Sequence, residues 1–477
     1  MTDILLLNLP VTSLRYKSMM QLASRSFPCG LGSLSGTLKA AGHSFNVLDA
    51  DALDMPLDKM ISTVVTARPR IIGISTYSSY ADITQYVIEE IKKSLPDCIM
   101  VLGGHHAFAA RHRLLNETQA DIVAIGEGEL LFLEVCNAIL HGKDLESVKG
   151  ICFRKHGNIV RTADRDCIKE LDKLPIPAYE YFPMDKYQGH FWRRWVSGYR
   201  KPFVGIMTSR GCAYRCAFCS NVMWGRQIRY RSPENVINEI DHLVKNYGVR
   251  QISFHDDTFS SNMKRTEMIC DLLIEKDYDL DLYCSTRVDC LNEPLIRKMA
   301  KAGFKWIGIG IESGNDKILK KMSKDFSVGI CSDILHVVAK NGIAIYGAMI
   351  LGYPGEDKRT LMDTLKFVLN NPIHFPQFNV FVAYPGTSVY NKLIAEHHVI
   401  PSNTNQFSEV VSYNKDISRQ YLVFFQWYSF FRSFLNRRYL GLISKTFKMH
   451  IVFLDIPKMV WSMLRLNRAK TEFTRFE

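Results

Sequence analysis

The chain has 477 residues, of which 47% are hydrophobic and 23% charged, and both fractions are ordinary for soluble globular proteins. Collagen-like, largely disordered and multi-span membrane chains are therefore excluded, and about 150 residues per domain gives roughly three domains. The formal net charge is +12, but residues 417–477 alone hold eleven Lys and Arg against three Asp and Glu. The body of the chain is nearly neutral, which disfavours a nucleic-acid-binding surface.

The N-terminus and the cysteines predict a cytoplasmic location. The chain begins with MTDILLLNLP, which lacks the basic stretch and apolar core of a signal peptide. Because cytosolic thiols stay reduced, the twelve cysteines indicate metal binding or catalysis rather than disulfides. The longest uncharged aromatic run, 420–431, has 12 residues, whereas a membrane-spanning helix needs about 18 or more. We expect no transmembrane segment, and at most association with a membrane surface.

Residues 1–145 are predicted to form a doubly wound, Rossmann-like α/β domain. Strands are expected at 4–8, 45–50, 71–76, 98–104 and 121–126, alternating with helices at 30–42, 82–94 and 127–140. Such alternation is typical of a parallel sheet whose ligands bind beyond the carboxyl ends of the strands. Three of those ends read STYSS (75–79), GGHH (103–106) and GEGE (126–129). No G-x-G-x-x-G follows the first strand, so the nicotinamide or flavin fingerprint is missing.

The rest of the chain is divided into a linker, a partial barrel and a helical end. Residues 146–198 contain Pro175, Pro177 and the stretch FWRRW (191–195), and we interpret them as a linker. Within residues 199–400, six βα units predict a partial (β/α)6 barrel of the TIM type, with its site at the carboxyl ends of the strands. Its strands are expected at 202–209, 251–257, 282–287, 304–312, 343–352 and 378–385. Residues 401–477 are predicted to be helical, basic and aromatic.

The strongest chemical signal follows the first barrel strand. Cys212, Cys216 and Cys219 have C-x3-C-x2-C spacing in SRGCAYRCAFCSN, at a strand end where a barrel places its site. Three thiolates on one short loop can hold three irons of a 4Fe-4S cluster and leave the fourth iron open to another ligand. Zinc is a weaker alternative, because it would need a fourth Cys or His nearby and the next cysteine downstream is Cys270.

The cysteine loop resembles that of the radical S-adenosylmethionine (SAM) enzymes, in which an aromatic residue, here Phe218, precedes the last cysteine. The resemblance implies that Cys212, Cys216 and Cys219 bind a 4Fe-4S cluster and that the open iron binds the methionine part of SAM. It also implies that Phe218 lines the adenine. Electron transfer from the reduced cluster would then cleave SAM and yield a 5'-deoxyadenosyl radical.

Further stretches resemble the strand ends of the same family. They are FHDDTF (254–259), TRVDCL (286–291), GIGIESG (308–314), GAMILGYPGE (347–356) and YPGT (384–387). By this match Glu312 and Ser313 contact the ribose or the methionine amine of SAM. Asp256, Asp257 and Arg287 are further candidates for contact with cofactor or substrate, and ion pairs at the top of the barrel are the alternative.

The front domain is similar to the cobalamin-binding unit that precedes the barrel in one large branch of these enzymes, the class B radical SAM methyltransferases. The resemblance implies that cobalamin lies against the strand ends, where the candidate residues are Ser75, Gly103, Gly104, His105, Gly126, Glu127 and Gly128. The chain lacks D-x-H-x-x-G, the motif that supplies a histidine ligand to cobalt in other cobalamin domains. We therefore expect cobalamin without a histidine ligand, with His105 and His106 lining its pocket.

The C-terminal region permits two interpretations. Aromatic and apolar residues recur at helical spacing from Tyr421 to Leu435, accompanied by Arg432, Arg437 and Arg438. One interpretation is a helix packed into the core. The other is a basic amphipathic element on an anionic membrane surface, which would suit a lipid-like substrate.

Together these features predict a cobalamin-dependent radical SAM methyltransferase that acts on an unactivated carbon of a small-molecule or lipid-like substrate. A flavodoxin- or ferredoxin-type reductant is expected as a partner, and nucleic acid is not. Within the enzyme class, the alternative is a radical oxidative cyclase or another C-C bond-forming rearrangement. In a different class, the alternative is a non-catalytic cobalamin-binding scaffold, which the intact cysteine loop disfavours.

Overall fold

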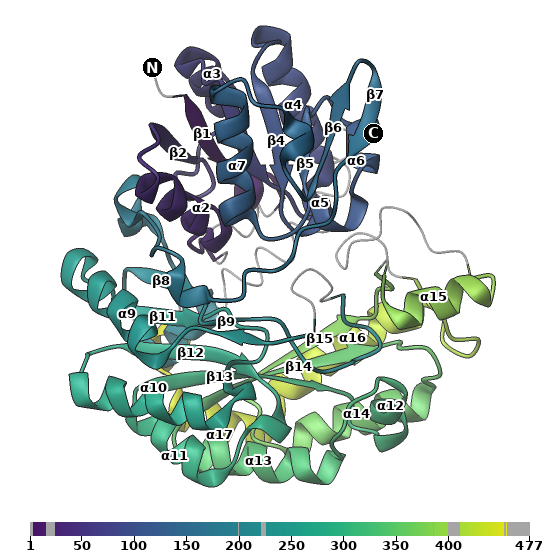
Figure 1. Cartoon of the computed structure of the whole chain (residues 1–477). Helices are drawn as coiled ribbons and strands as arrows, with labels where there is room; N and C mark the ends of the chain where they lie inside the picture. Colours follow the sequence, from purple (N-terminus) through teal and green to yellow (C-terminus); the bar gives the residue numbers. More distant parts are fainter. Residues whose placement is uncertain are drawn as a thin grey trace. The chain divides into compact units, whose positions relative to one another are not determined.

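The structure, a computed structural model, describes residues 3–15, 24–198, 200–220, 226–384, 386–398, 411–452 and 455. The chain divides into two compact units. Unit 1 contains the described residues up to Phe191 together with Lys201–Gly205, and unit 2 contains Trp192–Arg200 and Ile206–Val452. The two large sheets and the helices around them are labelled in Figure 1.

Unit 1 is built on a seven-stranded sheet of order β2-β1-β3-β4-β5-β6-β7. Strands β1 to β5 run parallel, and β6 and β7 extend the sheet in antiparallel fashion. The strands are β1 (Ile4–Asn8), β2 (Phe45–Asp49), β3 (Ile71–Ser75), β4 (Ile99–Gly103), β5 (Ile122–Ala124), β6 (Ile151–Lys155) and β7 (Asn158–Arg161). The helices are α1 (Val11–Arg15), α2 (Cys29–Ala40), α3 (Leu57–Ala67), α4 (Ala81–Ser94), α5 (His105–Ala110), α6 (Arg113–Glu117) and α7 (Gly128–Leu140).

The first sheet has the reversal of strand order at which doubly wound folds bind their ligands. Strand order reverses at β1, and ligands of doubly wound sheets bind at such a reversal. A strand covered on both faces needs successive apolar residues, and the four residues from Ile4 to Leu7 are all buried. The five predicted strands of this sheet are present, whereas α3, α5 and α6 were not predicted. Strands β6 and β7 lie in the segment that we interpreted as a linker.

The second sheet has six strands in the order β15-β14-β13-β12-β11-β8, and β11 to β15, which all belong to unit 2, run parallel. The strands follow one another in chain order, as in a partial (β/α) barrel. They are β8 (Phe203–Ile206), β11 (Gln251–Phe254), β12 (Asp281–Thr286), β13 (Phe304–Glu312), β14 (Ala344–Leu351) and β15 (Phe375–Val380). The helices are α8 (Arg194–Ser197), α9 (Pro233–Tyr247), α10 (Met263–Lys276), α11 (Glu293–Lys301), α12 (Asp316–Lys321), α13 (Val328–Lys340), α14 (Lys358–Asn370), α15 (Ser388–Ala395), α16 (Arg419–Phe434) and α17 (Arg437–Thr446).

A short antiparallel ribbon brackets the cysteine loop. It consists of β9 (Ser209–Arg210), just before the cysteine loop, and β10 (Arg229–Tyr230), after it. The two strands pair with each other, so the chain segments on either side of the loop lie side by side. The remaining elements are single 3-10 turns at η2 (Ser78–Tyr80), η3 (Leu145–Ser147), η4 (Leu171–Lys173), η5 (Tyr179–Tyr181), η6 (Met184–Lys186), η7 (Phe191–Arg193), η8 (Phe259–Ser261) and η9 (Val288–Cys290).

The stretch FWRRW, which we interpreted as part of a linker, is packed against strands of the second sheet. Trp192 stacks on Tyr346 with ring centroids 5.0 Å apart, and its ring centroid lies 4.7 Å from that of Trp306. Arg193 is buried, and its guanidinium lies 3.8 Å from the ring centroid of Tyr283. We call Trp192 and Arg193 the floor residues, because they cover one end of the strand face that carries Tyr283 and Tyr346.

Helix α16 packs through one face only. Leu422 and Phe425 are buried, and Gln426 Nε2 donates to the carbonyl oxygen of Phe378 in β15 at 2.7 Å. Phe424 and Phe431, from the same predicted aromatic stripe, are exposed. The core interpretation therefore holds for Phe425 and not for these two. Among the described residues, no helix has both the length and the apolar character that crossing a membrane requires.

Candidate functional site

The cysteine loop is tied to neighbouring elements by its own backbone. The N–H of Ala217 donates to the carbonyl oxygen of Met322 at 2.9 Å, and the carbonyl oxygen of Ala217 accepts from the N–H of Val389 at 3.2 Å. Cys212 and Cys216 are half-buried, and Cys219 is exposed. Within the described part of the chain, no three His, Cys, Asp or Glu side chains converge on one ion. Ligands of a 4Fe-4S cluster bind separate irons, so such convergence is not what they require.

A buried ion pair lies beside the cysteine loop. Lys324 Nζ is 3.0 Å from Glu312 Oε1 and 3.2 Å from the carbonyl oxygen of Gly310, and the Lys324 and Glu312 side chains are 4% and 11% exposed. Lys324 Nζ also lies 5.7 Å from the ring centroid of Phe218. Lys324, which no sequence motif identified, therefore contacts two predicted residues. These are Glu312, the predicted SAM contact, and Phe218, which is predicted to line the adenine.

The backbone at the end of β13 is shaped for this pair. Glu312 has φ of +67°, in the left-handed region that most side chains avoid. A Cβ atom on Gly310 would lie 2.4 Å from Glu312 Oε1, so a larger residue there would displace the carboxylate. Backbone strain of this kind is typical of functional positions. The glycine and the strained glutamate together hold the carboxylate where Lys324 reaches it.

Arg287 contributes a second positive charge at the loop. Its Nε and Nη2 donate to the two carboxylate oxygens of Asp289 at 2.8 Å each, and its Nη1 donates to Cys216 Sγ at 3.4 Å. The guanidinium also stacks on Tyr214, 3.6 Å from its ring centroid. Burial raises the pKa of the Cys216 thiol, while the charges of Lys324 and Arg287 act in the opposite direction. Thiolate ligation is therefore helped by the two cations, and the donor set fits an iron-sulfur cluster.

Three other predicted residues differ in what they contact. Asp256 is buried and accepts from the Thr208 N–H at 2.7 Å, the Thr208 hydroxyl at 2.6 Å and the Ser209 hydroxyl at 2.6 Å, which fixes the start of the cysteine loop. Ser313 is buried, and its hydroxyl lies 3.3 Å from Thr364 Oγ1 of α14. Asp257 is exposed. Asp256 thus anchors the start of the cysteine loop through hydrogen bonds, not through the ion pair considered as the alternative.

One face of the second sheet carries polar side chains that solvent reaches. Tyr283 and Ser285 of β12 share a hydrogen bond of 3.1 Å, and Gln377 Nε2 of β15 donates to Asn379 Oδ1 at 3.0 Å. Side chains on this face alternate with fully buried ones along β12, β14 and β15. His255, just after β11, is partly open to solvent, yet the surrounding protein and the Arg193 charge lower its pKa to about 4. Its imidazole is therefore neutral at neutral pH.

In unit 1, several predicted cobalamin residues gather at the ends of β3, β4 and β5. Gly104 has φ of +91°, and a Cβ there would lie 2.8 Å from Ser75 Oγ, so only glycine allows this close approach. A Cβ at Gly103 or Gly126 would meet no atom of the described residues within 4 Å, so within this part of the chain both glycines border open space. His105 is exposed, with its ring centroid 5.2 Å from that of Tyr77.

Two residues of the GEGE stretch have structural contacts. Glu127 is buried and accepts from the N–H of Ile168 at 2.5 Å. Gly128 begins α7, where a Cβ would lie 3.0 Å from Leu34 of α2. His106, expected to line the pocket, has its Nδ1 atom 2.9 Å from Ser78 Oγ. Burial lowers the pKa of His106. These contacts link the strand ends to the helices around them.

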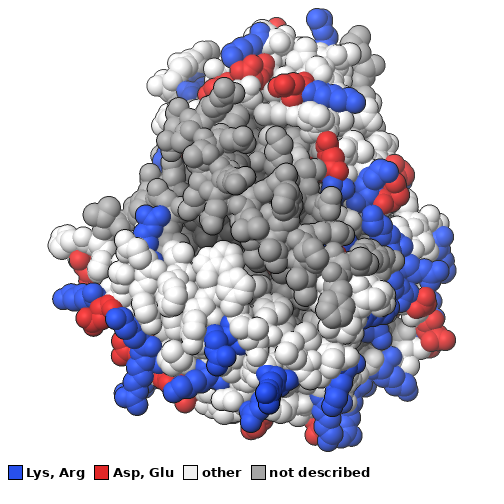
Figure 2. Space-filling model, turned by 180° about the vertical axis from the view of Figure 1, so that it is seen from behind, with Lys and Arg blue, Asp and Glu red and all other residues white. Residues whose placement is uncertain are grey.

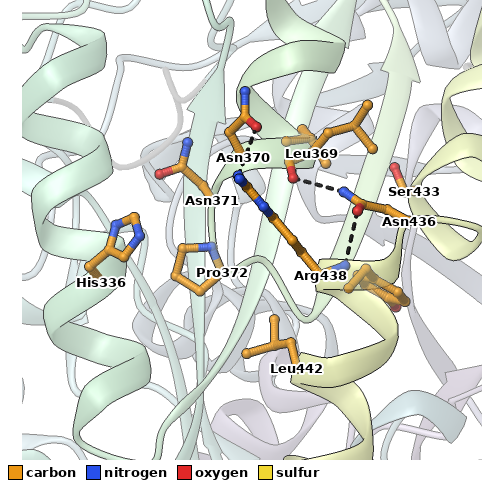
Figure 3. A pocket seen from close by; sticks show the side chains of 11 residues that line it. His336, Leu369, Asn370, Asn371, Pro372, Ser433, Asn436, Arg438 and Leu442 are labelled. Atoms are coloured by element: carbon orange, nitrogen blue, oxygen red, sulfur yellow. Dashed lines mark hydrogen bonds between the residues drawn. The ribbon is translucent and has the colours of Figure 1, made fainter.

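A cavity of about 170 Å³ lies elsewhere in unit 2, where the end of α14 meets the start of α17 (Figure 3). Asn436 Nδ2 donates to the carbonyl oxygen of Leu369 at 2.8 Å, and Arg438 Nη1 donates to Asn370 Oδ1 at 3.1 Å. The lining contains none of the predicted site residues. The cavity is therefore separate from the cysteine loop.

Two family models match the chain. The radical SAM superfamily model matches residues 206–368, and the B12 binding domain model matches residues 19–136. The chain is 30% identical over 386 residues to an uncharacterized methyltransferase of Pyrococcus horikoshii, covering 80% of this chain and 82% of that protein. It is 26% identical over 389 residues to the anaerobic magnesium-protoporphyrin IX monomethyl ester cyclase of Rubrivivax gelatinosus, covering 78% of this chain and 67% of the cyclase.

Two solved structures have a similar fold. One is the radical SAM methyltransferase TsrM of Kitasatospora setae with cobalamin and a 4Fe-4S cluster bound, with a TM-score of 0.68 and 17% identity, covering 83% of this chain and 75% of TsrM. The other is the cobalamin-dependent radical SAM enzyme OxsB, with a TM-score of 0.66 and 19% identity, covering 86% of this chain and 58% of OxsB. The predicted fold class, a Rossmann-like unit followed by a partial barrel and helices, is confirmed.

Proposed function

Because the chain belongs to the cobalamin-dependent radical SAM enzymes of the methyltransferase type, we propose that it methylates an unactivated carbon of a small molecule. One observation carries the proposal: a single chain combines both cofactor domains with 30% identity to a methyltransferase over 80% of its length. The predicted cofactors, a 4Fe-4S cluster, SAM and cobalamin, are confirmed as those of this family. When bound, they supply a carbon-centred radical and a transferable methyl group.

Cys212, Cys216 and Cys219 are proposed to hold the cluster. The three cysteines lie on one loop. Hydrogen bonds of the backbone N–H and the carbonyl oxygen of Ala217 fix this loop, so all three thiols belong to one anchored segment. The cations of Arg287 and Lys324 favour the thiolate form at Cys216. Arg287 is proposed to act on the cluster side of the site, because it donates to a cluster cysteine and not to Glu312.

The buried pair of Glu312 and Lys324 is proposed to bind the methionine part of SAM. That part carries an ammonium and a carboxylate, and the pair offers a carboxylate and an ammonium about one hydrogen bond apart. Phe218 lies within 5.7 Å of Lys324 and is proposed to line the adenine. Ser313, next to Glu312, and Asp257, exposed at the end of β11, are proposed as further contacts.

Cobalamin is proposed to lie against the strand ends of unit 1. The open positions at Gly103 and Gly126 and the tight turn at Gly104 let a flat ligand approach the backbone. Ser75 and His105 are proposed to line this site, and Glu127 and Gly128 to shape it through their packing. The domain bounds 1–145, 146–198, 199–400 and 401–477 also stay a proposal.

The substrate is proposed to bind at the polar strand face of unit 2. Ser285, Gln377 and Asn379 offer hydrogen-bond donors and acceptors, and neutral His255 can donate with one ring nitrogen and accept with the other. A substrate without polar groups would leave these side chains unsatisfied when water is displaced. The face therefore favours a small molecule with hydroxyl, amide or carbonyl groups over a bare hydrocarbon chain.

The test begins with anaerobic reconstitution using iron, sulfide and hydroxocobalamin, followed by mass spectrometry of metabolites from cells with and without the gene. A compound that gains one methyl unit only when the gene is present identifies the substrate. With that substrate, a chemical reductant as the electron donor and SAM labelled in its methyl group, the purified enzyme is expected to form S-adenosylhomocysteine, 5'-deoxyadenosine and labelled product. Cys216→Ala is expected to abolish all three, whereas Cys167→Ala, at an exposed cysteine outside the loop, is expected to retain them.

Radical cyclisation is the second candidate, and the 26% identity to the Rubrivivax gelatinosus cyclase favours it. The two reactions differ in their co-products. Cyclisation yields 5'-deoxyadenosine without S-adenosylhomocysteine, and its product has lost hydrogen instead of gaining a methyl unit. We do not propose the non-catalytic scaffold, because the chain belongs to an enzyme family.

A flavodoxin- or ferredoxin-type protein is proposed as the reductant, because the cluster chemistry of this family consumes single electrons. Replacing a chemical reductant by flavodoxin, its reductase and NADPH is expected to support SAM cleavage. A cytoplasmic location is likewise proposed, and it is supported by the twelve cysteines, all of which are free thiols. Association with a membrane surface through the C-terminal helices is proposed as well.

A further inference from the structure

Helix α16 has two apolar faces on opposite sides. Leu422, Phe425, Ser429 and Ser433 form the buried face, which packs inward. We call Phe424, Trp427, Phe431 and Leu435 the outer stripe, whose exposed fractions are 60%, 42%, 54% and 70%. At about 100° per residue the outer stripe points away from the buried face. A helix that only closes the core would carry polar side chains in those positions.

The segment that contains the outer stripe, residues 417–454, carries formal charge of one sign only. Residues 417–454 contain no Asp or Glu and hold six cations, at positions 419, 432, 437, 438, 445 and 448. Among the described residues, no carboxylate forms an ion pair with any of the six. Arg438 donates to Asn370 and Lys448 to the carbonyl oxygen of Ser197, both neutral groups. On the lower half of the molecule, Figure 2 shows uncharged, white areas bordered mostly by blue Lys and Arg side chains, with fewer red Asp and Glu side chains among them.

We propose that the outer stripe docks on an anionic lipid surface. Apolar and aromatic side chains bordered by cations are the features by which a helix lies in a membrane interface. Cations near an anionic leaflet are attracted to it, and Trp427 has the amphipathic ring that favours the headgroup level. A second copy of the chain is a poorer partner, because two such faces would bring twelve uncompensated cations together.

This inference goes beyond the proposed methylation and does not depend on it, because the outer stripe contains none of the site residues. A membrane-bound enzyme of this type would meet substrates and products that partition into the interface. Docking by a helix face is reversible and salt-dependent, unlike insertion of a spanning helix.

The test is flotation of the full-length protein with vesicles of phosphatidylcholine alone or mixed with phosphatidylglycerol. We expect binding to the anionic vesicles about tenfold stronger than to the neutral ones, weakened by added salt. The variant Phe424→Ser/Phe431→Ser/Leu435→Ser is expected to lose this binding. The control Leu53→Ser/Ile330→Ser/Ile394→Ser changes three apolar residues of similar exposure elsewhere and is expected to keep it.

Three outcomes would overturn the proposal. They are no binding to anionic vesicles, equal binding by the two triple variants, and concentration-dependent dimers that the outer-stripe variant abolishes without any vesicle binding. SAM cleavage is measured for each variant in the absence of vesicles and is expected to stay unchanged. Failure of methylation with intact flotation would therefore count against the proposed function alone.

Discussion

Lys324 carries a positive charge at a position that water hardly reaches. Its side chain is 4% exposed and its partner is Glu312 at 3.0 Å. Removing one member of such a pair leaves an uncompensated buried charge, which costs about 3–5 kcal/mol, whereas removing both costs much less. We expect Lys324→Met to lower the free energy of unfolding by that amount and Lys324→Met/Glu312→Gln to recover most of it, as measured by urea denaturation.

The control for this buried ion pair is a solvent-exposed ion pair. Lys392 Nζ lies 3.8 Å from Glu396 Oε1, with side chains 73% and 50% exposed, and such pairs contribute about 0–1 kcal/mol. Lys392→Met should therefore change stability little. If the double variant at Lys324 and Glu312 recovers stability but not SAM binding by the reconstituted enzyme, the pair serves the cofactor. If it recovers both, the proposed contact with SAM is wrong.

Glu356 provides a pH-dependent contribution to stability. Its Oε2 accepts from the N–H groups of Gly352 at 2.6 Å and Tyr353 at 3.0 Å, and burial raises its pKa from 4.5 to about 8 despite those bonds. Below pH 4.5 the Glu356 carboxyl is protonated in both the folded and the unfolded chain. Between pH 4.5 and about 8 only the unfolded chain loses the proton, so stability falls as pH rises, by up to about 1.4 kcal/mol per unit.

The measurement is the free energy of unfolding across that pH window. Glu356→Gln is expected to remove the fall, because glutamine stays neutral in both states. Glu396→Gln changes an exposed carboxylate and should leave the pH profile of the parent protein intact. A profile for Glu356→Gln that still matches the parent would contradict the assignment.

At the residue scale, a site can be predicted from the sequence where spacing itself encodes the chemistry. The three cysteines and Phe218 lie on one short segment, so their proximity needs no knowledge of the fold. Lys324 follows Glu312 by twelve positions and reaches it only because the loop after α12 turns back on β13. Nothing in its local sequence distinguishes it from a surface lysine, and its burial alone reveals it.

At the scale of single elements, α2 shows how a glycine allows close packing. A Cβ on Gly36 would lie 2.3 Å from the carbonyl oxygen of Ile176, whereas one on Gly30, in the same helix, meets nothing within 4 Å. We expect Gly36→Ala to destabilise the protein by about 1–3 kcal/mol, as overpacking does. Gly30→Ala should be neutral or stabilise by up to about 1 kcal/mol. Thermal unfolding of both variants compares them, and equal effects would refute the packing argument.

Elements with a strong local pattern were predictable, and those fixed by distant contacts were not. The predicted strands 4–8 and 304–312 coincide with β1 and β13, because a buried parallel strand is a continuous apolar run. Strands β6 and β7 are short, and the antiparallel edge that they form depends on β5. The floor residues pack on β12 to β15, so their role as part of unit 2 could not be seen in the segment 191–195 itself.

At the scale of the whole molecule, the two proposed cofactor sites belong to different units. We expect Cys212→Ala/Cys216→Ala/Cys219→Ala to lose iron and retain cobalamin. Conversely, Gly103→Leu should lose cobalamin and retain iron, because among the described residues no atom lies within 4 Å of the added Cβ and the larger side chain would extend into the proposed cobalamin site. Both predictions are checked by measuring the iron and cobalt content per chain after anaerobic reconstitution. Loss of both metals in either variant would mean that the sites are not independent.

The position of the floor residues in the chain has an evolutionary consequence. Trp192 and Arg193 come from the connector between the two sheets, yet they pack against strand residues near the polar face on which we place the substrate. Strand residues are constrained by the hydrogen-bonded ladder and by the helices behind it, whereas the two buried floor residues are constrained by packing alone. Exchange of a floor side chain for another of similar volume would therefore change the lining of the proposed substrate site and diversify the molecules accepted, while the residues proposed to hold the cofactors stay the same.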